Sequence, residues 1–284
     1  MNNLQYFIRL LHPISWIHNY KSKILFLIIF LFITSCSTKI EKQYNFEIID
    51  QIMESAIIDS VFPGASILFG IDQQVLYSKA FGHFTYDKNS PKDQTNSIFD
   101  LASVTKVVGT TSAAMILIHE GKLNLDDKVI KYLPEFNNNG KDKITIRNLL
   151  LHNSGLAAFK RYYDVYTTGD EIIKDIMNLP LENLPGEKYV YSDLGMITLQ
   201  KVMEKISGKP INIFLKENLF DPLEMNNTMY HPSNDIIYKC VPTEIDTVWR
   251  HKLIQGEVHD ERAAILNGIA GHAGLFSTTE DLSK

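Results

Sequence analysis

Ser103-Val104-Thr105-Lys106 stands at the start of the apolar stretch TKVVGTTSAAMILI, residues 105–118, which decides how we interpret this chain. Lys106 carries the only formal charge in that stretch. A helix that is apolar nearly all round is buried, and burial disfavours the charged form of a lysine amine. Ser103 lies three residues earlier, on the same helical face and within reach of that amine. The pattern therefore fits a serine nucleophile with a lysine base, although a serine N-cap followed by an ordinary lysine would give the same pattern.

The composition of the 284 residues is that of an ordinary globular protein, with 45% hydrophobic and 21% charged residues. This length allows one large domain or two modest ones. The net charge is −5, the sequence pI is about 6.0, and no basic stripe is present. These values argue against general nucleic-acid binding, so we expect no nucleic-acid partner.

The N-terminal segment predicts export. Residues 24–34, ILFLIIFLFIT, form an apolar run that follows Lys21 and Lys23. Such a run is too short for an ordinary membrane span and is typical of a signal-peptide core. The sequence Ile33-Thr34-Ser35-Cys36 then resembles the lipobox of a bacterial lipoprotein, which implies that Cys36 is lipidated and becomes the first residue of the mature chain. A plain secretory signal and an uncleaved anchor are the alternatives.

We therefore expect residues 1–35 to be a lipoprotein signal peptide and residues 36–45 to be a tether. The mature protein would be lipid-anchored at the periplasmic or cell-surface face of a bacterial membrane. Cys240 is then the only cysteine besides the lipidated one, so no intrachain disulfide forms. We expect Cys240 to be a small, at least half-buried side chain, because nothing near it in the sequence suggests a nucleophile.

Periodicity predicts a helix, a β-hairpin and then a long helical section. The expected helices are residues 46–58, 105–118, 123–133, 145–152, 170–179 and 193–207. The expected strands are residues 65–71 and 75–82, joined through Asp72-Gln73, whereas residues 226–262 predict neither helix nor strand. Two strands make only a marginal sheet. The chain thus predicts an α/β protein whose sheet needs more strands than these.

Tyr191-Ser192-Asp193 forms a second candidate site, between a loop containing Pro185-Gly186 and the helix expected from about residue 193. Side chains at such junctions often face a cleft. A tyrosine beside a lysine ammonium loses its proton more readily and can serve as a base. The alternative is an aromatic side chain packed on a loop.

Together, Ser103-x-x-Lys106 and Tyr191-x-Asp193, 88 residues further on, resemble the serine β-lactamase and penicillin-binding-protein superfamily. The most similar branch contains class C β-lactamases, D-alanyl-D-alanine carboxypeptidases and related esterases. Other stretches resemble that branch as well, namely residues 99–102, 120–127, 149–156 and 271–278. The resemblance spans about residues 46 to 284, essentially the whole expected mature chain.

The resemblance implies a β-lactamase/transpeptidase-like α/β (α+β) fold, in which helices flank an antiparallel sheet and a helical domain is inserted. Residues 46–100 and 265–284 would form a partial α/β domain, and residues 101–264 the helical domain. It also implies a serine hydrolase that acts through an acyl-enzyme on a β-lactam, a D-Ala-D-Ala-type peptide or a small ester. Neither a metal nor an organic cofactor is expected.

The implied roles follow the motifs. Ser103 attacks the acyl carbonyl, and Lys106 and Tyr191 move its proton. Asp193 orients Lys106 or contacts the substrate. The family usually has asparagine at the position of Asp193, and a carboxylate cannot donate a hydrogen bond to a substrate carbonyl unless it is protonated. This departure puts β-lactam or peptide recognition in doubt and leaves simpler esters open.

A second departure concerns the third motif of the family, Lys/His-Thr/Ser-Gly, which is not found. His272-Ala273-Gly274 fits it only loosely and matches instead a segment that leads into a helix. We therefore expect a C-terminally truncated member with an incomplete sheet. The alternative function is a non-catalytic envelope lipoprotein or inactive fragment that keeps the fold as a binding module.

The remaining polar clusters predict no separate site. The histidines at 152, 251, 259 and 272 fit no compact metal site, and H-E-x-x-H is absent, so ordinary structural or surface histidines are expected. Asp260-Glu261-Arg262 is expected to be a solvated charge cluster, with a position lining the cleft as the alternative.

Overall fold

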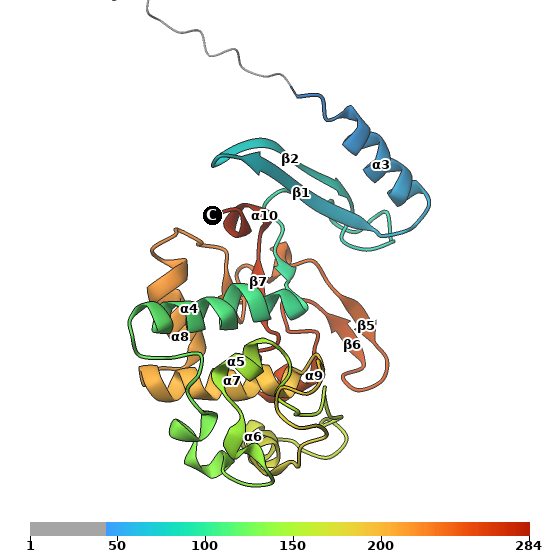
Figure 1. The fold of residues 1–284 in the computed structure, drawn as a ribbon. Helices are drawn as coiled ribbons and strands as arrows, with labels where there is room; N and C mark the ends of the chain where they lie inside the picture. Colours follow the sequence, from blue (N-terminus) through green and yellow to red (C-terminus); the bar gives the residue numbers. More distant parts are fainter. Residues whose placement is uncertain (1–43) are drawn as a thin grey trace, which may run out of the picture. The chain divides into compact units, whose positions relative to one another are not determined.

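The computed structural model describes residues 44–284, so the predictions for Cys36, for the signal peptide and for most of the tether lie outside the described residues. Residues Phe46–Lys284 form one compact unit (Figure 1). Among the helices of the described part, none is both long and apolar enough to cross a membrane.

The unit begins with the helix and hairpin that the sequence predicts. Helix α3 (Glu47–Ile58) is followed by antiparallel strands β1 (Gly64–Ile71) and β2 (Gln74–Gly82). Asp72 and Gln73 form the connecting turn with φ values of 49° and 64°, the left-handed conformation that a tight hairpin requires. The hairpin prediction is confirmed.

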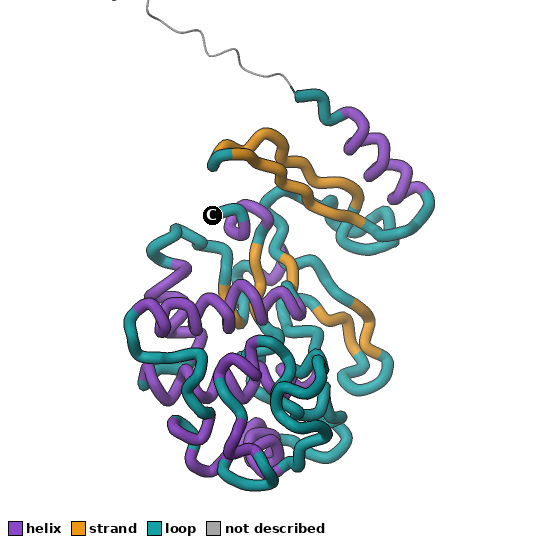
Figure 2. The backbone as a smooth tube through the Cα atoms, viewed as in Figure 1, coloured by secondary structure: helices purple, strands orange, loops and turns teal. Residues whose placement is uncertain are grey.

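Two further antiparallel sheets are built from very short strands, as the orange segments of Figure 2 show. The first has the order β3-β7-β4, and the second pairs β5 with β6. Their bounds are β3 (Phe99–Asp100), β4 (Met229–Tyr230), β5 (Glu244–Asp246), β6 (Lys252–Ile254) and β7 (Leu275–Ser277). The prediction that residues 226–262 lack strands is wrong. Strands of two or three residues are too short to show a period, and β4 pairs with a segment near the end of the chain.

The remaining helices match most of the predicted ones. They are α4 (Ser112–His119), α5 (Ile146–Leu150), α6 (Gly169–Asn178), α7 (Asp193–Ser207), α8 (Ile211–Leu215), α9 (Glu261–Ile265) and α10 (Thr279–Leu282). The predicted helix over residues 123–133 is wrong, since only the 3-10 turn Val129–Lys131 forms there. Side chains of Asn124 and Asp127 bond nearby backbone N–H groups, and such bonds compete with helix formation.

Helix α7 is the central element of the main core and fixes Asp193 at its first turn. Ser192 caps it by accepting a hydrogen bond from the N–H of Gly195 at 3.0 Å, and Gly208 ends it in the left-handed conformation. Leu199, Val202 and Met203 of α7 pack in one buried cluster with the apolar side chains of α4, which are Ala113, Ala114 and Leu117. The two helices that carry the candidate residues are therefore held by one core.

Lys141 is a fully buried lysine that closes the C-terminus of α6. Its Nζ donates to the carbonyl oxygens of Met177 at 2.9 Å and Leu179 at 2.6 Å, and lies 4.9 Å from the centroid of the Phe136 ring. A cation at a helix C-terminus satisfies the last carbonyls and matches the helix dipole. Burial lowers the pKa of Lys141 to about 8.

This burial predicts a pH dependence of stability. Between pH 8 and the ordinary lysine range, the unfolded chain binds a proton that the folded chain does not, so the free energy of unfolding rises with pH. The gain from Lys141 is at most about 3 kcal/mol. Urea titrations at pH 7.5 and pH 10.5 give the free energies of unfolding of the wild type and of Lys141→Met. The gain is the change, between the two pH values, in the difference between these two free energies. Lys143→Met removes an exposed lysine of the same turn and is the control. A difference that stays constant between the two pH values contradicts this prediction.

Candidate active site

Ser103 lies on a strained turn directly after β3. It belongs to the 3-10 turn Ala102–Val104, and Ala102 has a φ of 44°, a left-handed conformation that costs alanine about 1 kcal/mol or more. Asp100 stabilises this turn, since one carboxylate oxygen accepts from the N–H of Ala102 at 2.8 Å and the other from the N–H of His259 at 2.7 Å. The turn leaves Ser103 exposed.

Lys106 begins a π-helical segment, Lys106–Thr111, that continues into α4. Its side chain is only 4% exposed. Nζ lies 2.8 Å from Ser103 Oγ, 3.0 Å from the carbonyl oxygen of His272 and 2.8 Å from Asp193 Oδ1. The structure thus brings Ser103 and Lys106 into contact, as their spacing predicts, and adds two partners that hold the amine in place.

Tyr191 lies beside Lys106 but presents the face of its ring to it. Lys106 Nζ is 4.8 Å from the ring centroid, and the side of Tyr191 is covered by His152, whose ring centroid is 4.6 Å away. Nδ1 of His152 accepts a hydrogen bond from the N–H of Ser192 at 3.1 Å. Burial, and then the charge of Lys106, lower the pKa of His152, so that Nδ1 keeps its lone pair at neutral pH. His152 therefore has the structural role expected of it.

Asp193 has a cation at each carboxylate oxygen. Oδ1 contacts Lys106 at 2.8 Å, and Oδ2 contacts Nη1 of Arg262 at 2.9 Å. The side chain is 13% exposed. With both oxygens engaged, Asp193 is placed to orient Lys106, which is one of its two expected roles, and has no hydrogen to donate to a substrate.

Asp260 and Arg262 are part of this site, so the prediction of a solvated cluster is wrong for both of them. Their side chains are 19% and 15% exposed, and they form an ion pair of 2.5 Å. Burial alone would raise the pKa of Asp260, but the hydrogen bond from His272 and the nearby guanidinium hold it well below its usual range. Asp260 also caps α9 by accepting from the N–H of Ala263 at 2.8 Å. An aspartate N-cap at a helix start was the only sequence signal for this position.

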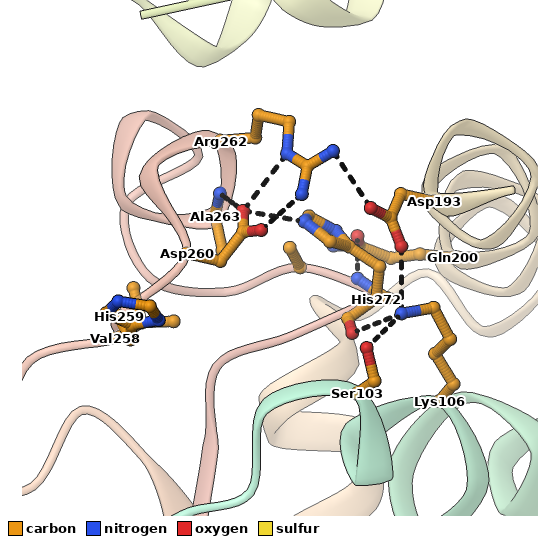
Figure 3. A network of polar contacts seen from close by, with 12 residues as sticks. Ser103, Lys106, Asp193, Gln200, Val258, His259, Asp260, Arg262, Ala263 and His272 are labelled. Atoms are coloured by element: carbon orange, nitrogen blue, oxygen red, sulfur yellow. Dashed lines mark hydrogen bonds and ion pairs between the residues drawn. The ribbon is translucent and has the colours of Figure 1, made fainter. Parts of the chain in front are cut away.

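His272 joins the two ends of the network that Figure 3 shows. Its carbonyl oxygen accepts from Lys106, and its Nε2 lies 2.9 Å from Asp260 Oδ1. Neighbouring Gly271 is fixed on both sides, because its carbonyl accepts from Thr110 Oγ1 at 2.6 Å and its N–H donates to Gln200 Oε1 at 2.8 Å. The segment around Gly271 and His272, which the sequence predicts only to lead into a helix, thus lines the site.

Asp193, Asp260 and His272 bring potential metal-ligand atoms within 4.8 Å of one another. The guanidinium of Arg262 bridges the two carboxylates of this group. Arg262 therefore supplies one positive charge to the two carboxylates, and Lys106 contacts Asp193 with a second. The geometry is accounted for by the chain's own side chains.

A serine in contact with a buried lysine, on the first turn of a helix that packs beside a short antiparallel sheet, defines a serine β-lactamase-like protein. The chain belongs to the Beta-lactamase family, whose model matches residues 47–284. It is 33% identical over 267 residues to an N-acetylmuramyl-L-alanine amidase of Bacillus subtilis, covering 83% of this chain and 60% of that protein. It is 31% identical over 274 residues to a provisionally assigned D-alanyl-D-alanine carboxypeptidase of Escherichia coli K12, covering 84% and 63%.

The fold is shared with solved structures. The penicillin-binding protein homologue from Pyrococcus abyssi superimposes with a TM-score of 0.68 at 24% sequence identity, covering 84% of this chain and 55% of that one. The expected β-lactamase/transpeptidase-like fold is confirmed. The chain spans 60% and 63% of the lengths of the two relatives named above.

Proposed function

We propose that this protein is a serine hydrolase of the bacterial cell envelope that forms an acyl-enzyme at Ser103. The observation that carries the proposal is the 2.8 Å contact between Ser103 Oγ and the amine of Lys106, a side chain only 4% exposed. An adjacent base within hydrogen-bond reach is what converts a weak serine hydroxyl into a nucleophile.

In the proposed reaction, Ser103 Oγ bonds to the carbonyl carbon while its proton passes to the neutral amine of Lys106, with Tyr191 assisting. The backbone N–H of Ser103 donates to the oxyanion that forms. The intermediate then collapses, the bond to the leaving group breaks, and the leaving group takes the proton. Water attacks the resulting ester in the second half of the reaction and releases Ser103.

The substrate we propose is an acyl compound derived from the cell wall or a small ester. The names of the amidase and carboxypeptidase relatives support cell-wall material. The two cations on Asp193 support simple esters over amides, because this residue cannot donate to an amide carbonyl. We also propose that a lipid on Cys36 anchors the protein to a membrane.

Covalent labelling tests the proposal. The protein, expressed with any residues that its reading frame encodes after Lys284, is incubated with a fluorophosphonate and, separately, with a fluorescent penicillin. We expect one adduct per chain, mapped to Ser103 by peptide mass spectrometry, with faster labelling by the fluorophosphonate. Heat-denatured protein is the control and should not react. If neither probe modifies Ser103, the hydrolase proposal is wrong and a non-catalytic binding module replaces it.

A further inference from the structure

Arg262 and its partner Asp260 are charged side chains of the network to which the acyl-enzyme chemistry gives no role. The contacts form a closed ring, in the order Lys106, Asp193, Arg262, Asp260 and His272, which returns to Lys106 through the His272 carbonyl (Figure 3). Two carboxylates and two cations alternate around this ring. The ring is therefore balanced in charge when Lys106 is an ammonium and His272 is neutral.

A carboxylate in contact with the catalytic lysine raises a difficulty for the proposed mechanism. Asp193 and Lys106 touch at 2.8 Å with side chains 13% and 4% exposed, so water screens their attraction weakly. A lone carboxylate in this position would hold Lys106 as an ammonium. An ammonium has three donors and no lone pair, so it cannot take the proton of Ser103.

We propose that Arg262 is a positioning residue that balances the charge of Asp193, so that Lys106 can alternate between ammonium and neutral amine. Nη1 of Arg262 lies 2.9 Å from Asp193 Oδ2, the oxygen that Lys106 does not contact. Arg262 thereby competes with Lys106 for the same negative charge. This inference rests on the proposed function and explains how the family's motif works here with aspartate in place of asparagine.

The surroundings of Arg262 hold it in this position. Nη2 contacts Asp260, whose other oxygen is held by His272, and the guanidinium lies 5.4 Å from the centroid of the Phe159 ring. A planar guanidinium can bridge two carboxylates, whereas a lysine ammonium acts as a point charge. Nδ1 of the buried His272 has no hydrogen-bond partner among the described residues, so only its Nε2 is engaged, at Asp260.

Other charged and titratable groups face Lys106 and Arg262 from the elements packed against them. Those on the side of Lys106 are His152 and Tyr191, and those on the side of Arg262 are Glu261, Asp175 and Tyr162. Asp175 is itself bound to Lys160 at 2.8 Å. Arg262 remains the only cation in contact with Asp193 besides Lys106 among residues 44–284.

The test is the pH dependence of Ser103 labelling by the fluorophosphonate. With Arg262→Gln, Lys106 faces an unbalanced carboxylate and stays protonated to higher pH. We expect the labelling rate at pH 7 to fall about tenfold and the acidic limb of the pH–rate profile to move up by about one pH unit. With Asp193→Asn, Lys106 loses its carboxylate partner while Arg262 stays paired with Asp260, so the limb should move down.

The double variant Asp193→Asn/Arg262→Gln gives the sharpest outcome. It removes both charges together, so its acidic limb should lie between those of the single variants, and it should label faster than Arg262→Gln at pH 7. A purely structural role would instead make the double variant the slowest. Arg147→Gln is the matched control, because Arg147 makes an exposed two-contact pair with Asp126 at 2.9 and 3.1 Å on another part of the unit.

The outcomes separate the two proposals. If the wild type is not labelled at Ser103, the proposed function is wrong and this inference goes with it. If the wild type is labelled but Arg262→Gln keeps the wild-type pH profile, or if the double variant is no faster than Arg262→Gln, only the role of Arg262 is wrong. Circular dichroism checks that each variant folds. If Arg262→Gln does not fold, Arg262→Lys keeps the charge, and its profile should then resemble that of the wild type.

Discussion

Lys106→Met should slow the acylation of Ser103 by roughly a thousandfold, within the range of loss typical for a missing general base. Methionine fills much of the same volume, but it leaves Ser103 Oγ with no proton acceptor in place of the amine at 2.8 Å. Asp193 keeps its contact with Arg262, so its carboxylate does not become an unpaired buried charge. The loss should therefore fall on the rate of labelling much more than on folding.

Rates of fluorophosphonate labelling across pH, together with thermal melting, measure this effect. Lys141→Met is the matched control, because it also replaces a buried lysine but in a distant cluster at the end of α6. That variant should be labelled at the wild-type rate at pH 7. A Lys106→Met protein that is labelled within tenfold of the wild-type rate would show that another group activates Ser103.

The local parts of the fold were readable from the sequence because their signals are local. The hairpin follows from two alternating segments joined by two turn residues, Asp72 and Gln73. Helix α5 lies within the predicted helix over residues 145–152, and the structure shows that Thr145 starts it with a capping box to Asn148. The segment 123–133 misled the prediction because its apolar spacing is helical, whereas its polar side chains bond the backbone of a turn.

Within the site as well, the sequence predicts contacts between neighbouring residues but not contacts between residues far apart in the chain. Ser103 and Lys106 are three residues apart on one turn, so a helical pattern places them together. His272 reaches Lys106 across 166 residues, and no periodicity reports such a contact. A run of charged residues is usually exposed, which predicts a solvated Arg262, and only the tertiary structure shows which carboxylates surround it.

The aspartate of the second motif gains its meaning from that tertiary structure. In the sequence, Asp193 departs from the family's usual asparagine, which weakens the case for recognition of amide substrates. In the structure it is the link between two cations, so its chemistry depends on Arg262, which lies 69 positions later in the chain. A change at one of these two positions should therefore be judged together with the other.

Gly271→Ala should damage both stability and reactivity, because the backbone of α7 passes too close for a side chain. A Cβ at this position would lie 2.4 Å from the carbonyl oxygen of Met196 and 3.0 Å from Cβ of Gln200. The Met196 oxygen belongs to a buried helix and cannot rotate away, so residues 271–272 must shift. We expect the free energy of unfolding to fall by about 3 kcal/mol, as for overpacking in a tight core, and Tm by roughly 6–12 °C.

The shift should also reach Ser103. Gly271 is bonded to Thr110 and Gln200, and His272 presents its carbonyl to Lys106, so moving the segment releases one of the three contacts of the amine. A displacement of about 1 Å at a catalytic group costs on the order of a hundredfold in rate. Labelling of the folded variant should fall accordingly.

Gly195→Ala is the matched control for stability. Gly195 lies on α7 as well, but a Cβ there would meet its nearest atom, Ser192 Oγ, at 3.5 Å, an ordinary van der Waals distance. Alanine within a helix is favoured over glycine by up to about 1 kcal/mol, so this variant should melt at or above the wild-type temperature. The prediction is contradicted if Gly271→Ala has the same Tm as Gly195→Ala and is labelled at the wild-type rate. The close approach of Gly271 to α7 is then not what keeps the His272 carbonyl in contact with Lys106.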